Sequence, residues 1–304
     1  MLPIILLLAL ALVGSLGFVV YKITRPLKQA YLVTPQSFSQ ISGPVLKVTD
    51  ESWTNRDGTR ARGWLLKGAE GAPSVVLVHR YGGDRSWLFN LGVKINETTN
   101  FTILWPDLRG HGLNPTVTWT SFGMSESEDL LAALDFLETL RSEKKGKLVG
   151  DRVGLYGVEW GAYAALKAAH TDGRVKVLVL DSVPRDANEL VQDAVSATVG
   201  LDNNLLQYLA RNATRIYFLG KYQNVAACEL AASLHDQHVL LLSGVDAGYL
   251  KESTASLAPC FANKANVEIR TDLPLTGFNL PSATGEQGEG YDRIVIDYID
   301  KNLR

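Results

Sequence analysis

The sequence predicts an α/β protein with a mostly parallel sheet flanked by helices, and an alternation of two patterns predicts it. From Ser74 onward, short apolar runs rich in β-branched residues alternate with segments of helical periodicity, as in strands buried on both faces. The predicted strands are residues 74–79, 101–105, 152–156, 175–180, 239–243 and 267–271. The predicted helices are residues 128–141, 162–170 and 291–302. A chain of 304 residues, 46% of them hydrophobic and 20% charged, is long enough for one large core.

A hairpin is predicted before this alternating core. Residues 45–48 and 60–66 are two extended stretches. The connection between them contains Asp57-Gly58, and this pair supplies the positive φ that a tight turn needs. The sequence therefore predicts two strands joined as a hairpin.

A helical cap is predicted over residues 185–234. This segment interrupts the alternation of strands and helices with a mainly helical pattern. We expect it to cover the ends of the strands. Further upstream, Ser125 and Glu128 have the spacing of a capping box and are predicted to start the helix of residues 128–141.

The N-terminus has an unusual composition. Residues 2–21 contain no charged side chain, and about 20 helical residues span roughly 30 Å, the thickness of the hydrocarbon core of a bilayer. The sequence therefore predicts a transmembrane anchor over residues 1–24, a linker over 25–44 and a domain over 45–304. A cleaved signal peptide is the alternative, although no basic residues precede the apolar segment and no clear Ala-x-Ala site follows it.

Charge and cysteine content bear on topology and partners. Lys22, Arg25 and Lys28 follow the apolar segment, so the positive-inside rule predicts the domain on the cytoplasmic side of a membrane. A net charge of −2 without a long basic run predicts no nucleic-acid partner. Cys228 and Cys260 lack zinc-site spacing and could form at most one bridge; we expect them to be small, buried, apolar residues.

Three motifs follow predicted strands in a fixed order. They are Val-Val-Leu-Val-His-Arg-Tyr-Gly-Gly at residues 75–83, Asp-Leu-Arg-Gly-His-Gly at 107–112, and Val-Gly-Leu-Tyr-Gly-Val-Glu-Trp-Gly at 153–161. In this order they resemble the oxyanion loop, the D-x-R-G-H-G turn and the nucleophile elbow of the α/β-hydrolase superfamily, in particular its serine aminopeptidase-like and acyl-esterase-like branches. The resemblance runs from about Ser52 to the C-terminus and implies an α/β-hydrolase fold.

The resemblance assigns positions to the residues of a hydrolase site. It implies an oxyanion loop of His79, Arg80 and Tyr81, completed by Trp160 after the elbow. The nucleophile of this family is the serine of G-x-S-x-G, and here Glu159 occupies that position between Gly157 and Gly161.

Two further positions complete the comparison with a catalytic triad. Asp246 follows a late strand, where the resemblance places the triad acid. The triad histidine should follow the last strand, but Gly277 stands there and no histidine occurs after His238. Because the imidazole takes the proton of the serine, losing both residues removes nucleophile and base together, and Asp246 has nothing to orient.

We therefore predict a membrane-anchored, non-hydrolytic protein that binds a small molecule or a protein. An active hydrolase, esterase-like or peptidase-like, is the alternative; it would use an unconventional set such as Glu159 with His79 or His111. Otherwise these two histidines are expected to bond locally and shape their turns. A purely structural role in a membrane assembly is a third hypothesis.

Two other readings of the charged residues are tested by the structure. Glu159 and Arg80 are opposite in charge, which suggests that a bidentate ion pair between them fills the position of the hydrolase site. The alternative is that Arg80 points to solvent and Glu159 is exposed. Asp107, Glu159 and Asp246 could supply oxygen ligands, but no histidine pair has metal-ligand spacing. The sequence predicts no metal and no other cofactor.

Overall fold

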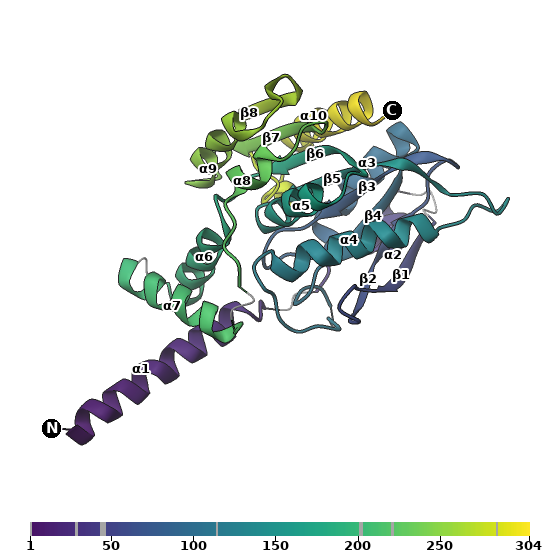
Figure 1. Ribbon diagram of the computed structural model, residues 1–304. Helices are drawn as coiled ribbons and strands as arrows, with labels where there is room; N and C mark the ends of the chain where they lie inside the picture. Colours follow the sequence, from purple (N-terminus) through teal and green to yellow (C-terminus); the bar gives the residue numbers. More distant parts are fainter. Residues whose placement is uncertain are drawn as a thin grey trace.

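The computed structural model of the protein describes residues 2–27, 30–42, 47–113, 115–200, 203–219, 222–283 and 285–304. Over these residues the centre of the domain is an eight-stranded sheet of order β1-β2-β4-β3-β5-β6-β7-β8 (Figure 1). The strands are β1 (Val48–Thr54), β2 (Arg60–Leu66), β3 (Ala72–Val78), β4 (Thr102–Asp107), β5 (Val149–Val158), β6 (Val175–Asp181), β7 (His238–Gly244) and β8 (Val267–Leu273). β2 runs antiparallel to its neighbours β1 and β4, and the other pairs are parallel. The predicted mostly parallel sheet is confirmed.

Helices cover both faces of the sheet (Figure 1). On one face, α4 (Met124–Thr139) and α5 (Trp160–Thr171) pack through a core that includes Leu130, Leu134 and Leu166. On the other face, α3 (Phe89–Thr99) and α10 (Gly285–Leu303) pack through a second core. The strands between the two cores are apolar on both sides because each side is excluded from water.

The predicted hairpin is present with a shifted first strand. Gly58 has φ +83° in the turn, and the Asn55 backbone N–H donates to the Thr59 carbonyl at 2.7 Å. The first strand is β1, which begins at Val48; residues 45 and 46 of the predicted stretch lie outside the described residues. The prediction stopped at the first polar residues, whereas β1 is a largely exposed edge strand that tolerates them.

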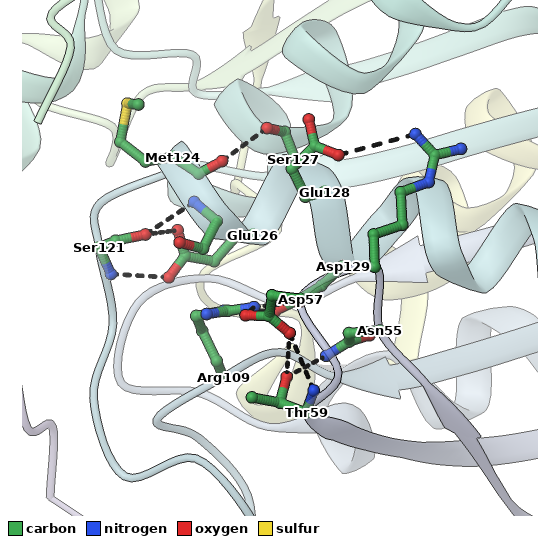
Figure 2. Close-up of polar contacts among 12 residues, drawn as sticks. Asn55, Asp57, Thr59, Arg109, Ser121, Met124, Glu126, Ser127, Glu128 and Asp129 are labelled. Atoms are coloured by element: carbon green, nitrogen blue, oxygen red, sulfur yellow. Dashed lines mark hydrogen bonds and ion pairs between the residues drawn. The ribbon is translucent and has the colours of Figure 1, made fainter. Parts of the chain in front are cut away.

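The predicted capping box at the start of α4 is wrong. The helix begins at Met124, and the side chain of Glu126 accepts hydrogen bonds from the backbone N–H groups of Gly123 at 2.8 Å and Ser121 at 2.7 Å. Figure 2 shows Glu126 beside Ser121, while Glu128 faces away and forms an ion pair with Arg56 at 3.6 Å. The buried glutamate therefore caps the helix, and the exposed one does not.

The described part of residues 185–234 contains three helices, α6 (Ala187–Val199), α7 (Asn204–Tyr217) and α8 (Ala227–Ala232). α6 and α7 contact the C-terminal part of α1 (Leu2–Ile23), and the rest of α1 extends away from the domain (Figure 1). Two smaller helices are α2 (Pro35–Ser42), inside the predicted linker, and α9 (Leu250–Leu257).

The expectation that the cysteines are buried apolar thiols is wrong. Cys228 in α8 and Cys260 in a 3-10 helix (Ala258–Cys260) form a disulfide, and Cys228 is exposed. The two residues are 32 positions apart, so only the tertiary fold brings them together.

Helix α1 is long and apolar enough to cross a membrane, and its composition equally fits a signal sequence. Most of its apolar side chains are exposed, as a bilayer would require. Its last turn differs, because Val20 and Ile23 are buried against the domain.

Candidate functional site

The centre of the candidate site is Glu159, which lies between β5 and α5 with φ +53° and ψ −111°. A positive φ is strained for a residue with a Cβ and persists only where the surroundings impose it. The flanking glycines show why the turn is so tight. A Cβ on Gly157 would lie 2.5 Å from the Gly161 carbonyl oxygen, and a Cβ on Gly161 would lie 2.5 Å from the carbonyl oxygen of His79.

The carboxylate of Glu159 lies against the backbone of the oxyanion loop. Its Oε2 accepts the Tyr81 backbone N–H at 3.0 Å, and the backbone of Trp160 also hydrogen-bonds to the carboxylate. Burial raises the pKa of Glu159 to about 7, against the lowering effects of Arg80 and of these two hydrogen bonds. The side chain at the elbow thus occupies the two backbone donors that the resemblance assigned to an oxyanion.

Arg80 does not form the predicted bidentate ion pair with Glu159. Its guanidinium carbon lies 4.4 Å from the ring centre of Trp87 and 5.5 Å from that of Phe278, and its Nη1 donates to the Tyr81 carbonyl at 3.2 Å. The aromatic rings provide cation–π contacts that the charge argument did not include. Arg80 therefore acts on Glu159 through its electric field rather than through a hydrogen bond.

The two histidines near the elbow are fully engaged with backbone groups. In His79, Nε2 accepts the Leu108 N–H at 3.2 Å, and Nδ1 bonds the Arg80 carbonyl at 2.9 Å. In His111, Nε2 accepts the Gly82 N–H at 3.0 Å. Its Nδ1 bonds a backbone carbonyl at 2.9 Å. These partners fix both rings as neutral tautomers with protonated Nδ1. Burial lowers the pKa of each ring, consistent with that state.

The turn that carries His111 is held by a buried ion pair. Arg109 donates to both carboxylate oxygens of Asp129, at 2.7 Å from Nε and 2.5 Å from Nη2, and Nη2 also reaches Asp57 at 3.0 Å (Figure 2). Asp107 at the other end of the turn bonds the Arg85 backbone N–H at 3.0 Å and the Tyr31 hydroxyl at 2.7 Å. Asp107 therefore connects its turn to the segment after β3 and to Tyr31, which is a structural role.

Asp246 is exposed at the surface, and it takes no part in the hydrogen bonds of Glu159. Its Oδ2 accepts the Thr276 hydroxyl at 3.2 Å and the side-chain amide of Asn279. It therefore fastens the loop after β8 to the loop after β7. Within the described residues, no group of three or more His, Cys, Asp or Glu side chains is placed to hold a metal ion.

The Gly277 position has no room for an imidazole. A Cβ there would lie 2.6 Å from Val158 Cγ2 and 2.8 Å from the Tyr156 hydroxyl oxygen. The next residue, Phe278, is the one whose ring lies beside Arg80. A side chain at 278 rather than 277 therefore reaches the neighbourhood of the oxyanion loop.

A buried cluster of one aspartate and two tyrosines beneath this loop was not predicted from the sequence. Asp181, at the end of β6, accepts the Gly277 backbone N–H at 2.7 Å and the Tyr291 hydroxyl at 2.5 Å. The Tyr291 hydroxyl is also 2.7 Å from that of Tyr156. Burial raises the pKa of Asp181 to about 6. The signal in the sequence was an acidic residue ending an otherwise apolar strand, but its two tyrosine partners lie far away in the chain.

The end of α1 is bonded to the same loops. The Tyr81 hydroxyl donates to the Ile23 carbonyl at 2.6 Å, and the Thr120 backbone N–H donates to the Thr24 carbonyl at 2.8 Å. Two of the carbonyls left free at a helix C-terminus are satisfied in this way. Tyr81 therefore contacts Glu159 through its backbone and α1 through its side chain.

Comparisons with known proteins agree with this architecture. The esterase of Pyrococcus furiosus superposes with a TM-score of 0.66 and 17% identity, over 93% of this chain and 99% of that one. A thermophilic esterase from Thermogutta terrifontis gives a TM-score of 0.59 and 16% identity, over 84% of this chain and 100% of that one. The chain therefore has the α/β-hydrolase fold, as predicted.

Sequence comparisons are less extensive. No family model matches the chain. The dihydrolipoyllysine-residue acetyltransferase component of the acetoin cleaving system of Pseudomonas putida is 31% identical over 128 residues, which are 42% of this chain. The match spans about a third of that relative, 32% of its length.

The tight elbow predicts a specific stability difference. We expect Gly161→Ala to lower the free energy of unfolding by about 1–3 kcal/mol, because the new methyl group meets backbone oxygen. Gly173→Ala is the matched control, since no atom lies within 4 Å of its Cβ position. Urea unfolding followed by circular dichroism measures both. Equal stability of the two variants would contradict the packing described for the elbow.

The buried carboxylate predicts a pH dependence. The pKa of Glu159 is about 7 in the folded chain against an ordinary value of 4.5, so between these pH values only the folded state keeps the proton. The free energy of unfolding should therefore fall as pH rises through this window, by on the order of 3 kcal/mol relative to Glu159→Gln.

Urea unfolding of the wild type and of Glu159→Gln between pH 4.5 and 8 measures this difference. Glu143→Gln, at an exposed position, is the matched control. The difference in free energy of unfolding between the wild type and this variant should stay constant over the same pH range. Parallel profiles for wild type and Glu159→Gln would show that the pKa of Glu159 is not raised in the folded chain.

Proposed function

We propose that this protein is a membrane-anchored α/β-hydrolase-fold protein that has given up hydrolysis and serves to bind a ligand or a protein. The observation that carries the proposal is the hydrogen bond of Glu159 Oε2 to the Tyr81 backbone N–H, 3.0 Å long. In a hydrolase, such backbone donors must be free to stabilise the oxyanion of the transition state. Here the residue at the nucleophile position fills them itself.

The surroundings of Glu159 support the loss of hydrolysis. A carboxylate nucleophile forms an ester whose hydrolysis still needs a general base to activate water. The nearest histidines, His79 and His111, each use both ring nitrogens on backbone partners, which argues against the alternative of an unconventional catalytic set. The space at Gly277 is taken by Val158 and Tyr156, so no imidazole could stand there without rearrangement.

The membrane anchor is supported by the way α1 ends. Val20 and Ile23 are buried, and the carbonyls of Ile23 and Thr24 accept hydrogen bonds from the domain. A signal peptidase cutting at or after this turn would remove contacts that the oxyanion loop uses. We infer that α1 stays attached and crosses the membrane.

Two features bear on the side of the membrane, and they disagree. Lys22, Arg25 and Lys28 after the apolar helix favour a cytoplasmic domain, as the positive-inside rule predicts. The Cys228–Cys260 disulfide favours an oxidising compartment. We give the disulfide more weight, because three basic residues are a weak topological signal, and we propose an extracytoplasmic domain in place of the cytoplasmic one.

The proposed loss of hydrolysis predicts an inactive protein. We expect the full chain in detergent micelles to leave short-chain nitrophenyl esters intact above the buffer rate and to escape labelling by a fluorophosphonate probe. Glu159→Gln serves as the matched variant because it keeps the shape of the side chain. Turnover by the wild type that Glu159→Gln abolishes would refute the proposal and establish a glutamate-dependent hydrolase.

The proposed location predicts the state of the thiols. In membranes isolated directly into a polyethylene-glycol maleimide, with no other thiol reagent, the maleimide should modify neither Cys228 nor Cys260 before reduction and both after it. Gel mobility reports the number of modified thiols, and Cys228→Ser serves as the control with one free thiol. Two reactive thiols before reduction would instead place the domain in a reducing compartment.

A further inference from the structure

A cavity of about 510 Å³ lies where α1 meets the domain. Its walls come from the end of α1, the oxyanion loop and the C-terminal end of α6. The described residues that line it include Phe18, Lys22, Arg25, Arg80, Tyr81 and Thr198. The volume is within the range of small-molecule sites, about 300–1,000 Å³.

The charges around this cavity have one sign. Of the described lining residues, Lys22, Arg25 and Arg80 are basic and none is acidic. The Nε of Arg80 is buried without a hydrogen-bond partner, which leaves a donor unsatisfied. Lys22 has its ammonium over the Phe18 ring at 5.7 Å rather than on a carboxylate. The cavity thus offers positive charge and donors to an anion.

The polarity of the cavity also changes along α1. Phe18 and Lys22 are four residues apart, so they lie on one face of α1, and Arg25 follows two residues after the helix ends at Ile23. The apolar ring is on the side of the proposed membrane, and the two cations are on the side of the domain. A ligand that follows this face would have an apolar part in the bilayer and an anionic part at the domain.

We propose that this cavity binds the phosphate monoester head of an acyl lipid, with the acyl chain lying along the Phe18 face of α1. Three cations match a phosphate monoester, which carries a charge between −1.5 and −2 near neutral pH, better than a singly charged head. Charge-assisted hydrogen bonds from Lys22, Arg25 and Arg80 hold the phosphate. The site deepens the proposed function, since it rests on a membrane-anchored binding role and supplies the class of ligand.

The site differs in place from the hydrolase centre. Glu159 contacts the backbone of Tyr81, and the cavity is lined by Arg80, Tyr81 and Gly82 together with α1 and α6. Helix α1 is outside the part of the chain that resembles a hydrolase. The ligand would therefore contact both α1 and the oxyanion loop without entering the elbow.

The test uses the full chain in neutral detergent and native mass spectrometry, with 1-oleoyl lysophosphatidate as the probe. We expect one bound molecule per chain. 1-Oleoyl lysophosphatidylcholine has the same acyl chain with a head of no net charge, and we expect it to bind at least tenfold more weakly. Equal affinity for the two lipids would overturn the proposal, because the phosphate charge would then not be recognised.

Variants place the binding in the cavity. Lys22→Gln with Arg25→Gln should weaken lysophosphatidate binding at least tenfold, and Thr198→Trp should do the same by filling the space. The control pair Arg215→Gln with Lys301→Gln removes the same charge from exposed positions outside the cavity and should change affinity less than twofold. An equal loss in the control would show nonspecific attraction and overturn the site. Melting temperatures of all variants verify folding.

Two further measurements separate the source of the lipid and the chemistry. If the bilayer supplies the ligand, the chain purified from nanodiscs of phosphatidylcholine with 10% dioleoylphosphatidate should retain phosphatidate. Binding of micellar lysophosphatidate without retention of phosphatidate would identify a soluble source. Either result supports the phosphate site. Release of oleate from bound lysophosphatidate would refute the loss of hydrolysis and leave the site standing. Absence of binding to both lipids, without oleate release, would overturn the site alone.

Discussion

The hydrogen bond between the Glu159 carboxylate and the Tyr81 backbone N–H organises the candidate site. It joins the elbow after β5 to the loop after β3, two segments far apart in the sequence and adjacent in the sheet. A carboxylate is costly to bury, and backbone donors together with the field of Arg80 offset only part of that cost. The pKa of Glu159 is raised because the rest of this burial cost is not offset. The elbow backbone and its two glycines are present although glutamate rather than serine occupies position 159.

The fold was predictable because its strands are simple patterns. Runs such as residues 239–242 are apolar on both faces, as in a covered parallel sheet, and the D-x-R-G-H-G turn is the most specific part of the resemblance. Predictions failed where tertiary contacts override local pattern. Glu126 rather than Glu128 caps α4 because the loop of Ser121 folds back onto it, and an exposed edge strand such as β1 carries little apolar signal.

The candidate site was only partly predictable for the same reason. The sequence located Glu159, Arg80 and Gly277, because each lies at a position that a motif of the resembled family identifies along the chain. It could not predict that Arg80 stacks on Trp87 and Phe278, since aromatic partners from a distant loop have no motif. Nor could it find the cluster of Asp181 with its tyrosines, which depends on α10 returning beneath the sheet end.

The bond from the Tyr81 hydroxyl to the Ile23 carbonyl has a mechanical consequence. Tyr81 connects the elbow carboxylate, through its backbone N–H, to the last turn of α1, through its hydroxyl. Withdrawing α1 from the domain must break this bond, expose Ile23 and Val20 to water, and free the loop that holds Glu159. The resistance to tilting or pulling α1 is therefore shared between this bond, the bond to the Thr24 carbonyl and the buried last turn. Helix α1 is thus part of the framework of the site rather than a detachable tether.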